Sequence, residues 1–289
     1  MLNRQRAILG LIDEAGGEAS HLSVTKWAFL LREESASRGG SAFYQFVPYI
    51  YGPFSFSLYQ EASSLQLKGY ITADSDREWS VTTAGVAAAR KVKSNVRSDI
   101  KHIIRTHAKK SNRALINYVY NRFPWYTINS KIRQHECRPE AEVAVYTAGY
   151  EGLLIDGFLN GLMHNGIYRI IDVRNNPVSR RYGFHKSTLT RLCKKVGIEY
   201  VHYPELGIVS RNRQNLDQPG AREKLFDEYT SSTLVSETDA IKEVAKLVSD
   251  KPSVLVCMEA CHRDCHRSRL AESVARQNGL PIRHLEIKP

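Results

Sequence analysis

The sequence predicts a chain of two domains that differ in class. Residues 1–90 are expected to form a winged-helix-like domain, residues 91–141 a basic helical connector, and residues 142–289 an α/β domain with a Rossmann-like parallel sheet. A chain of 289 residues is long for one hydrophobic core. The apolar pattern also changes, from mainly helical spacing to alternating strands and helices, where the third segment begins. The composition of the whole chain, 42% hydrophobic and 25% charged, excludes collagen-like and wholly disordered proteins.

The first domain is expected to contain three helices before a two-stranded wing. Apolar residues recur at helical spacing in residues 3–14 and 23–32. A Gly-Pro pair then breaks the chain, and Ser55 or Ser57 can cap a third helix that ends at Gly69.

Two short strands, at residues 70–73 and 79–82, turn through residues 74–76 and form the expected wing, and a further helix opens at Thr83. In a winged helix-turn-helix the third helix enters a major groove of DNA. The polar residues of that helix that can face a groove are Ser63, Ser64, Gln66 and Lys68. Because the helix is not rich in Arg, a winged helix that contacts only proteins stays open as the alternative.

Positive charge is concentrated in one stretch of the chain, residues 90–138, called the basic segment below. It holds thirteen Lys or Arg against only Asp99 and Glu136, and so carries the whole net charge of +11. Clustered cations displace counterions from a polyanion, which indicates DNA or RNA as the partner. A solvated basic helix without a partner is the alternative. The expected nucleic-acid-binding residues are Lys101, Arg105, Lys109, Lys110 and Arg113.

The cysteines and the hydropathy pattern bear on the compartment. Five cysteines, three of them within nine residues, do not resemble a secreted disulfide framework. No stretch approaches the roughly 20 apolar residues of a membrane span, and the N-terminus lacks the apolar core of a signal peptide. We therefore expect a cytoplasmic protein without a membrane partner.

The third segment alternates buried strands with amphipathic helices. Strands are expected at residues 141–149, 168–174, 199–204, 253–259 and 282–287, and helices at 153–165, 186–196, 222–229, 238–249 and 265–279. This alternation predicts a parallel sheet covered on both faces, and ligands of such sheets bind beyond the carboxyl ends of the strands.

Polar side chains gather at those strand ends. The expected catalytic carboxylates are Glu151, Asp172 and Glu259. The expected substrate- or phosphate-binding residues are Tyr150, Arg174, Ser179, Arg180, His202, Cys257, His266 and Arg267. The alternative is that Asp172 and Arg174 simply pair with each other.

Three chemistries compete for this edge of the sheet. In the first, a carboxylate stabilises an oxocarbenium-like centre or activates water, and an arginine holds phosphate, as glycosidic cleavage of a flipped base would require. In the second, Cys257 and Arg263, or Cys261 and Arg267, form the C-x5-R loop of cysteine-dependent phosphatases and sulfur-transfer domains. That loop contains no Gly, and Glu259 would repel phosphate.

Zinc is the third possibility. The sequence supplies enough ligands in Cys257, Cys261, His262, Cys265 and His266. The spacing contains no C-x2-C pair, however, and the run enters a predicted helix. No cofactor is therefore expected, with zinc at Cys257, Cys261, Cys265 and His266 kept as the alternative.

Four motifs in residues 143–289 together resemble the domain-of-unknown-function 488 family: YTAGYEG, IIDVRNNPVSRRYGF, YVHYPELG and VCMEACHRDCHRSRLAE. The family pattern falls on Gly149, Tyr150, Asp172, Arg174, Pro177, Ser179, Arg180, Phe184, His202, Glu205, Gly207, Cys257, Glu259, Cys265, His266 and Arg267. Cys261 and His262 stand outside it, which weakens the zinc and phosphatase-like interpretations. The front segment YIYGPFSFSLYQ resembles winged-helix extensions of some members. The resemblance implies the fold and leaves the activity open.

These observations lead to two functional hypotheses. The first is an enzyme that hydrolyses a nucleic acid or nucleotide, with the N-glycosidic bond favoured over the phosphodiester bond. The second is a DNA-binding regulator or sensor that holds a small nucleotide ligand without turnover. Defence against foreign DNA suits both hypotheses.

Overall fold

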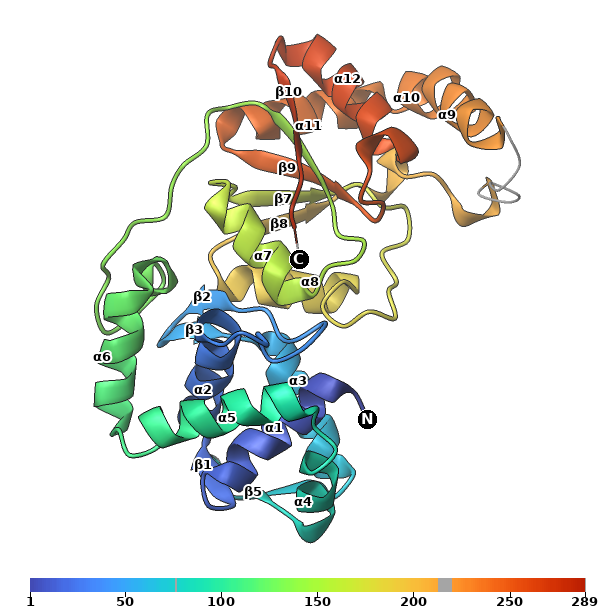
Figure 1. The fold of residues 1–289 in the computed structure, drawn as a ribbon. Coiled ribbons are helices and arrows are strands. Elements are labelled where there is room, and N and C mark those ends of the chain that lie inside the picture. Colours follow the sequence, from blue (N-terminus) through green and yellow to red (C-terminus); the bar gives the residue numbers. More distant parts are fainter. Residues whose placement is uncertain (76, 213–219, 289) are drawn as a thin grey trace. The chain divides into compact units, whose positions relative to one another are not determined.

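The computed structural model describes residues 1–75, 77–212 and 220–288 and divides the chain into two compact units, Met1–Cys137 and Arg138–Pro289 (Figure 1). Residue 76 of the predicted turn lies outside the described residues. In the described parts of the chain, no helix combines the length and apolarity needed to cross a membrane.

The N-terminal unit is helical, with a small antiparallel sheet. Its elements are α1 (Asn3–Glu14), β1 (Glu18–Ser20), α2 (His21–Glu34), β2 (Val47–Tyr49), β3 (Gly52–Phe54), α3 (Phe56–Leu67), β4 (Ile71–Ser75), β5 (Glu78–Val81), α4 (Thr83–Ala89), α5 (Ser94–His107), α6 (Asn112–Arg122) and the 3-10 helix η1 (Pro124–Thr127). The sheet has the order β1-β5-β4, and β2 and β3 form a separate antiparallel hairpin. The Ser55 hydroxyl accepts a hydrogen bond from the backbone N–H of Leu58 and caps α3, which confirms one of the two predicted caps.

Helices α5 and α6, expected in a connector, belong to the core of the N-terminal unit. The apolar face of α5 buries Ile100, Ile103 and Ile104, and α6 buries Leu115 and Val119, all in one cluster with residues of α1 and α2. An apolar face of this kind has to be covered, so the helices pack into the core while their cations stay exposed.

The C-terminal unit is an α/β domain. Its elements are β6 (Val145–Gly149), α7 (Ile155–His164), β7 (Arg169–Asp172), α8 (Lys186–Lys195), β8 (Glu199–His202), η2 (Pro204–Leu206), η3 (Ser210–Asn212), α9 (Ala221–Ser231), α10 (Thr233–Ser236), α11 (Thr238–Asp250), β9 (Ser253–Cys257), η4 (His262–Asp264), α12 (Arg267–Asn278) and β10 (Ile282–Leu285). The five strands are parallel, in the order β10-β6-β9-β7-β8. Helices α7 and α8 lie on one face of the sheet and α11 and α12 on the other (Figure 1). The predicted parallel sheet is thus confirmed.

Both faces of this sheet are apolar. Val145, Ile171 and Leu255 point into the cluster that also contains residues of α9, α11 and α12. All residues of β6, β7 and β9 are buried, as expected for inner strands covered on both sides. The polar groups at the ends of these strands are therefore held on a rigid frame.

Candidate functional site

The strand register brings the predicted polar residues to one edge of the sheet, called the rim below. Gly149 at the end of β6 is paired with Cys257 at the end of β9. Asp172 at the end of β7 is paired with Val256 on one side and His202 on the other. The carboxyl ends of these four strands thus meet, as the sequence predicted.

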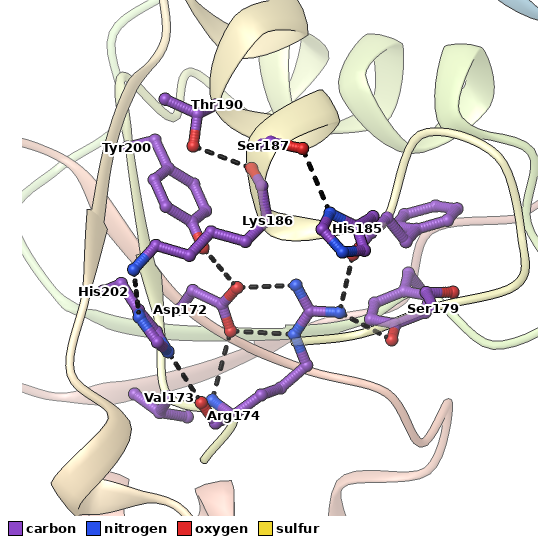
Figure 2. Close-up of polar contacts among 12 residues, drawn as sticks. Asp172, Val173, Arg174, Ser179, His185, Lys186, Ser187, Thr190, Tyr200 and His202 are labelled. Carbon is purple, nitrogen blue, oxygen red and sulfur yellow. Dashed lines mark hydrogen bonds and ion pairs between the residues drawn. The ribbon is translucent and has the colours of Figure 1, made fainter. Parts of the chain in front are cut away.

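Asp172 and Arg174 form a buried ion pair on the β7 side of the rim (Figure 2). Arg174 donates from Nε to Asp172 Oδ1 at 2.8 Å and from Nη2 to Oδ2 at 2.6 Å. The backbone N–H of Arg174 also donates to Oδ1 at 3.1 Å, and the Tyr200 hydroxyl donates to Oδ2 at 2.6 Å. Asp172 is 0% exposed and Arg174 5%. Both carboxylate oxygens are therefore already engaged by protein donors.

The remaining donors of Arg174 point into the protein as well. Its Nη1 donates to the Tyr150 hydroxyl at 2.8 Å and to the Phe184 carbonyl at 2.9 Å. The rings of Tyr150 and Phe184 are stacked with centroids 4.1 Å apart. Burial opposes the charge of Arg174, but the hydrogen bonds and charge of Asp172 outweigh it and raise the pKa of the guanidinium. This geometry supports the pairing alternative over a phosphate-binding role for Arg174.

His202 and Lys186 extend this network toward solvent. The Arg174 carbonyl lies 2.8 Å from His202 Nε2, and Lys186 Nζ lies 2.9 Å from His202 Nδ1 (Figure 2). Ser179 accepts a hydrogen bond from the backbone N–H of Arg181 at 3.1 Å, while Arg180 is exposed. Of the predicted phosphate-binding residues on this side, Arg180 is the one that presents its charge to solvent.

The β9 side of the rim has a different character. Cys257 Sγ lies 3.2 Å from Glu259 Oε2, and His266 Nδ1 lies 3.9 Å from the Sγ atoms of both Cys257 and Cys265. Cys257, Cys265 and His266, called the thiol cluster below, are all buried. The hydrogen bond from Cys265, helped by His266 and opposed by burial, holds the pKa of Cys257 well below its usual range. Burial and the neighbouring Cys257 raise the pKa of Glu259.

The segment after β9 crosses the end of β6. A Cβ atom on Gly149 would stand 1.8 Å from the Glu259 carbonyl oxygen, so only glycine permits this crossing. The exposed Glu151 accepts a hydrogen bond from the backbone N–H of Ala260 at 3.0 Å. Arg267 is 1% exposed and donates to the carbonyls of Glu259 and Ala260 at 2.5 and 3.0 Å. Arg267 therefore holds the segment in place, and Glu151 and Glu259 are brought to the same short stretch of chain.

Two predicted zinc ligands stand apart from the thiol cluster. Cys261 is exposed. The His262 ring stacks on His284 at 3.6 Å, and His284 Nδ1 lies 2.8 Å from the Thr147 hydroxyl. The sequence pattern did not identify His284, because the last strand offers only one histidine among otherwise ordinary strand residues.

The predicted nucleic-acid-binding residues lie on and after α5. Lys101, Arg105, Lys109 and Arg113 are exposed. Lys110 is half-buried, with its ammonium 5.9 Å from the centre of the Tyr118 ring and donating to the Thr106 carbonyl at 2.7 Å.

A cavity in the N-terminal unit was not predicted. It measures about 570 Å³ and is lined in part by Tyr49, Phe54, Tyr59 and Lys26. Lys26 is 3% exposed, and its ammonium donates to the carbonyls of Tyr51 and Pro53. Burial lowers its pKa to about 7. In the sequence Lys26 is one of several polar residues of α2, and this pattern gives no sign that its ammonium is buried.

The C-terminal unit is thus an α/β domain that carries cysteine, histidine and carboxyl side chains at the carboxyl ends of its parallel strands. Residues 154–274 match the family model described as a domain of unknown function, DUF488. This match confirms, for these residues, the family resemblance that the motifs predicted. No curated protein and no solved structure gives a significant match to this chain.

Proposed function

We propose that this chain binds nucleic acid through its N-terminal unit and hydrolyses a nucleic acid or nucleotide at the rim. The observation that carries the proposal is the exposure of the basic segment, where eleven of the thirteen Lys and Arg are exposed. Of its two acids, Asp99 accepts a hydrogen bond from the backbone N–H of Ser37 at 2.9 Å and is half-buried. Exposed cations with little opposing charge gain most by binding phosphates.

The cations of α5 share one side of the helix. Arg97, Lys101 and Arg105 follow one another at intervals of four residues along one exposed strip of the helix, beside the buried Ile100 and Ile104. Residues four apart lie about 6 Å apart along a helix, so the three charges form a row that can follow a phosphate backbone.

The topology of the N-terminal unit supports a winged-helix assignment. Helix α3 precedes the β4–β5 hairpin, and β1 completes the sheet as its third strand. On α3, Ser63 and Gln66 are exposed, and Leu67 is 90% exposed. Such a helix can reach base edges with short polar groups while α5 supplies the charge.

The binding half of the proposal is tested with two matched double variants. Lys101→Glu/Arg105→Glu should weaken binding of a labelled duplex or single strand by tenfold or more and reduce the salt slope by about 2, because each phosphate contact contributes about 1. Lys242→Glu/Lys246→Glu makes the same charge change at the same spacing on exposed positions of α11 and should leave affinity within about twofold. Equal losses in the two variants, or no binding by the unaltered protein at low salt, would overturn the proposal.

For the reaction, Glu259 and Glu151 are the carboxyl groups that fit hydrolysis. Glu259 is half-buried and has a raised pKa, so it can hold a proton for a leaving group. Glu151 is exposed and can stabilise positive charge on a sugar ring. This pairing favours the N-glycosidic bond over the phosphodiester bond. Asp172, with both oxygens engaged, acts in this scheme by positioning Arg174 and Tyr150.

The hydrolytic half is tested by release of free base, or of a nicked strand, from plain and modified DNA and RNA. Glu259→Gln should lower the rate by roughly 100- to 10,000-fold, the usual contribution of a general acid. Glu223→Gln, an exposed carboxylate on α9, is the control and should retain the full rate. Binding without turnover on any of these substrates would instead favour the sensor hypothesis.

A further inference from the structure

We propose that Cys257, Cys265 and His266 bind a zinc ion. Each of the three residues offers one ligand atom, and these atoms all lie within 4.8 Å of one another. Two thiolates and one imidazole are a donor set that selects zinc over magnesium or calcium, which require oxygen ligands.

The distances within the thiol cluster fit such an ion. Zinc holds sulfur at about 2.3 Å and imidazole nitrogen at about 2.0 Å, so bound sulfur and nitrogen atoms stand about 3.5 Å apart in a tetrahedron. His266 Nδ1 lies 3.9 Å from each of the two Sγ atoms. Each N–S separation would therefore have to shorten by only a few tenths of an ångström, and the two sulfur atoms already lie within 4.8 Å of each other.

The orientation of the imidazole is set from its other side. His266 Nε2 lies 3.2 Å from the Val173 carbonyl, which can only accept a hydrogen bond. A proton on Nε2 satisfies this carbonyl, and in that neutral tautomer the lone pair of Nδ1 faces the two sulfur atoms. A backbone carbonyl behind a histidine is the usual outer partner of a zinc ligand, because it fixes the tautomer.

The ligands also come from rigid elements. Cys257 ends β9, and Cys265 and His266 directly precede α12. The Tyr229 ring contacts His266 edge-on at 5.3 Å, and Arg267 hydrogen-bonds the intervening segment. Burial and the neighbouring Cys257 raise the pKa of Cys265, and a divalent ion would bind both sulfur atoms as thiolates and neutralise their charge. Three protein ligands leave a fourth position for a water, and Glu259, 3.2 Å from Cys257 Sγ, lies close enough to hydrogen-bond that water.

Metal binding by the full-length reduced protein is the first test. After chelation and removal of the chelator, the protein should take up one zinc ion per chain, and its melting temperature should rise because only the folded state holds the ligands together. Cobalt(II) in place of zinc should give a thiolate-to-cobalt charge-transfer band. Folded protein that shows neither stoichiometric zinc nor this band would overturn the proposal, whatever its hydrolytic activity.

Variants then identify the ligands. Cys265→Ser and His266→Gln should each lower zinc affinity by more than about 100-fold, beyond what loss of an outer partner costs. Cys261→Ser and Cys137→Ser change exposed thiols outside the cluster and should bind zinc as the unaltered chain does. If Cys261→Ser lost zinc while Cys265→Ser kept it, the assigned ligand set would be wrong.

Discussion

Lys26 and Arg174 are both buried cations, one in each unit, and their surroundings differ. Arg174 has a carboxylate partner, Asp172, with Nη2 and Oδ2 2.6 Å apart. Lys26 donates to two backbone carbonyls, of Tyr51 and Pro53, and burial lowers the pKa of its ammonium. The pKa of Arg174 is raised, whereas that of Lys26 falls to about 7.

The difference shows how a counter-charge decides the role of a buried cation. Paired with Asp172, Arg174 stays charged and ties the end of β7 to Tyr150 and Phe184. Without a carboxylate, the charge of Lys26 depends on the surrounding pH, and its side chain lines a cavity. Burial costs a charge several kcal/mol unless an opposite charge offsets it. The two residues should therefore respond differently to mutation and to pH.

The largest effect is expected from removing the carboxylate of the paired cation. Asp172→Asn leaves the guanidinium of Arg174 buried without a counter-charge and should destabilise the C-terminal unit by about 3–5 kcal/mol. All three tryptophans, Trp27, Trp79 and Trp125, lie in the N-terminal unit, so their fluorescence follows that unit alone. Urea unfolding should show an early transition by circular dichroism and an unchanged one by fluorescence. A shift confined to the fluorescence transition would contradict the assigned pairing.

A smaller effect is expected from pH at the unpaired cation. The pKa of Lys26 is about 7 in the folded chain against 10.5 ordinarily, so between these values the unfolded state binds more protons. Unfolding free energy should then rise with pH in this window, by at most about 1.4 kcal/mol per unit and by on the order of 2 kcal/mol from pH 7 to 9.

This linkage is isolated by comparison with Lys26→Met, which has no group to titrate at that position. The difference in unfolding free energy between the two proteins, followed by tryptophan fluorescence, should change with pH in the stated direction. Parallel pH profiles for both proteins would show that Lys26 keeps its charge when buried.

The smallest effect is expected at the exposed margin of the Asp172–Arg174 network. Lys186 is exposed, and its ammonium contacts His202 at 2.9 Å. Lys186→Met should change the stability of the C-terminal unit by less than about 0.5 kcal/mol, because water replaces the lost contact. Circular dichroism under the conditions used for Asp172→Asn provides the measurement, and a loss comparable to that variant's would mean that Lys186 belongs to the buried network.

Local patterns in the chain were enough to predict the architecture of the C-terminal unit. Apolar runs predicted the parallel strands, and the rule for strand ends predicted that Asp172, His202 and Cys257 would meet at one edge. The motifs indicated the family over residues 143–289, and the family model matches residues 154–274 of that range. Helices α5 and α6 were expected in a connector, but they pack in the core of the N-terminal unit. A basic amphipathic helix has the same sequence pattern in both settings, because the pattern does not show which residues pack against its apolar face.

By itself, the sequence determined which side chains reach the rim and where the positive charge lies, because strand periodicity and composition are local properties. Only the tertiary structure decided which of those side chains face one another. Asp172 is engaged by Arg174 and Tyr200, and Cys265 rather than Cys261 stands beside Cys257 and His266. Such choices depend on burial and on distances between residues far apart in the chain, and these exist only once the sheet and its helices have packed.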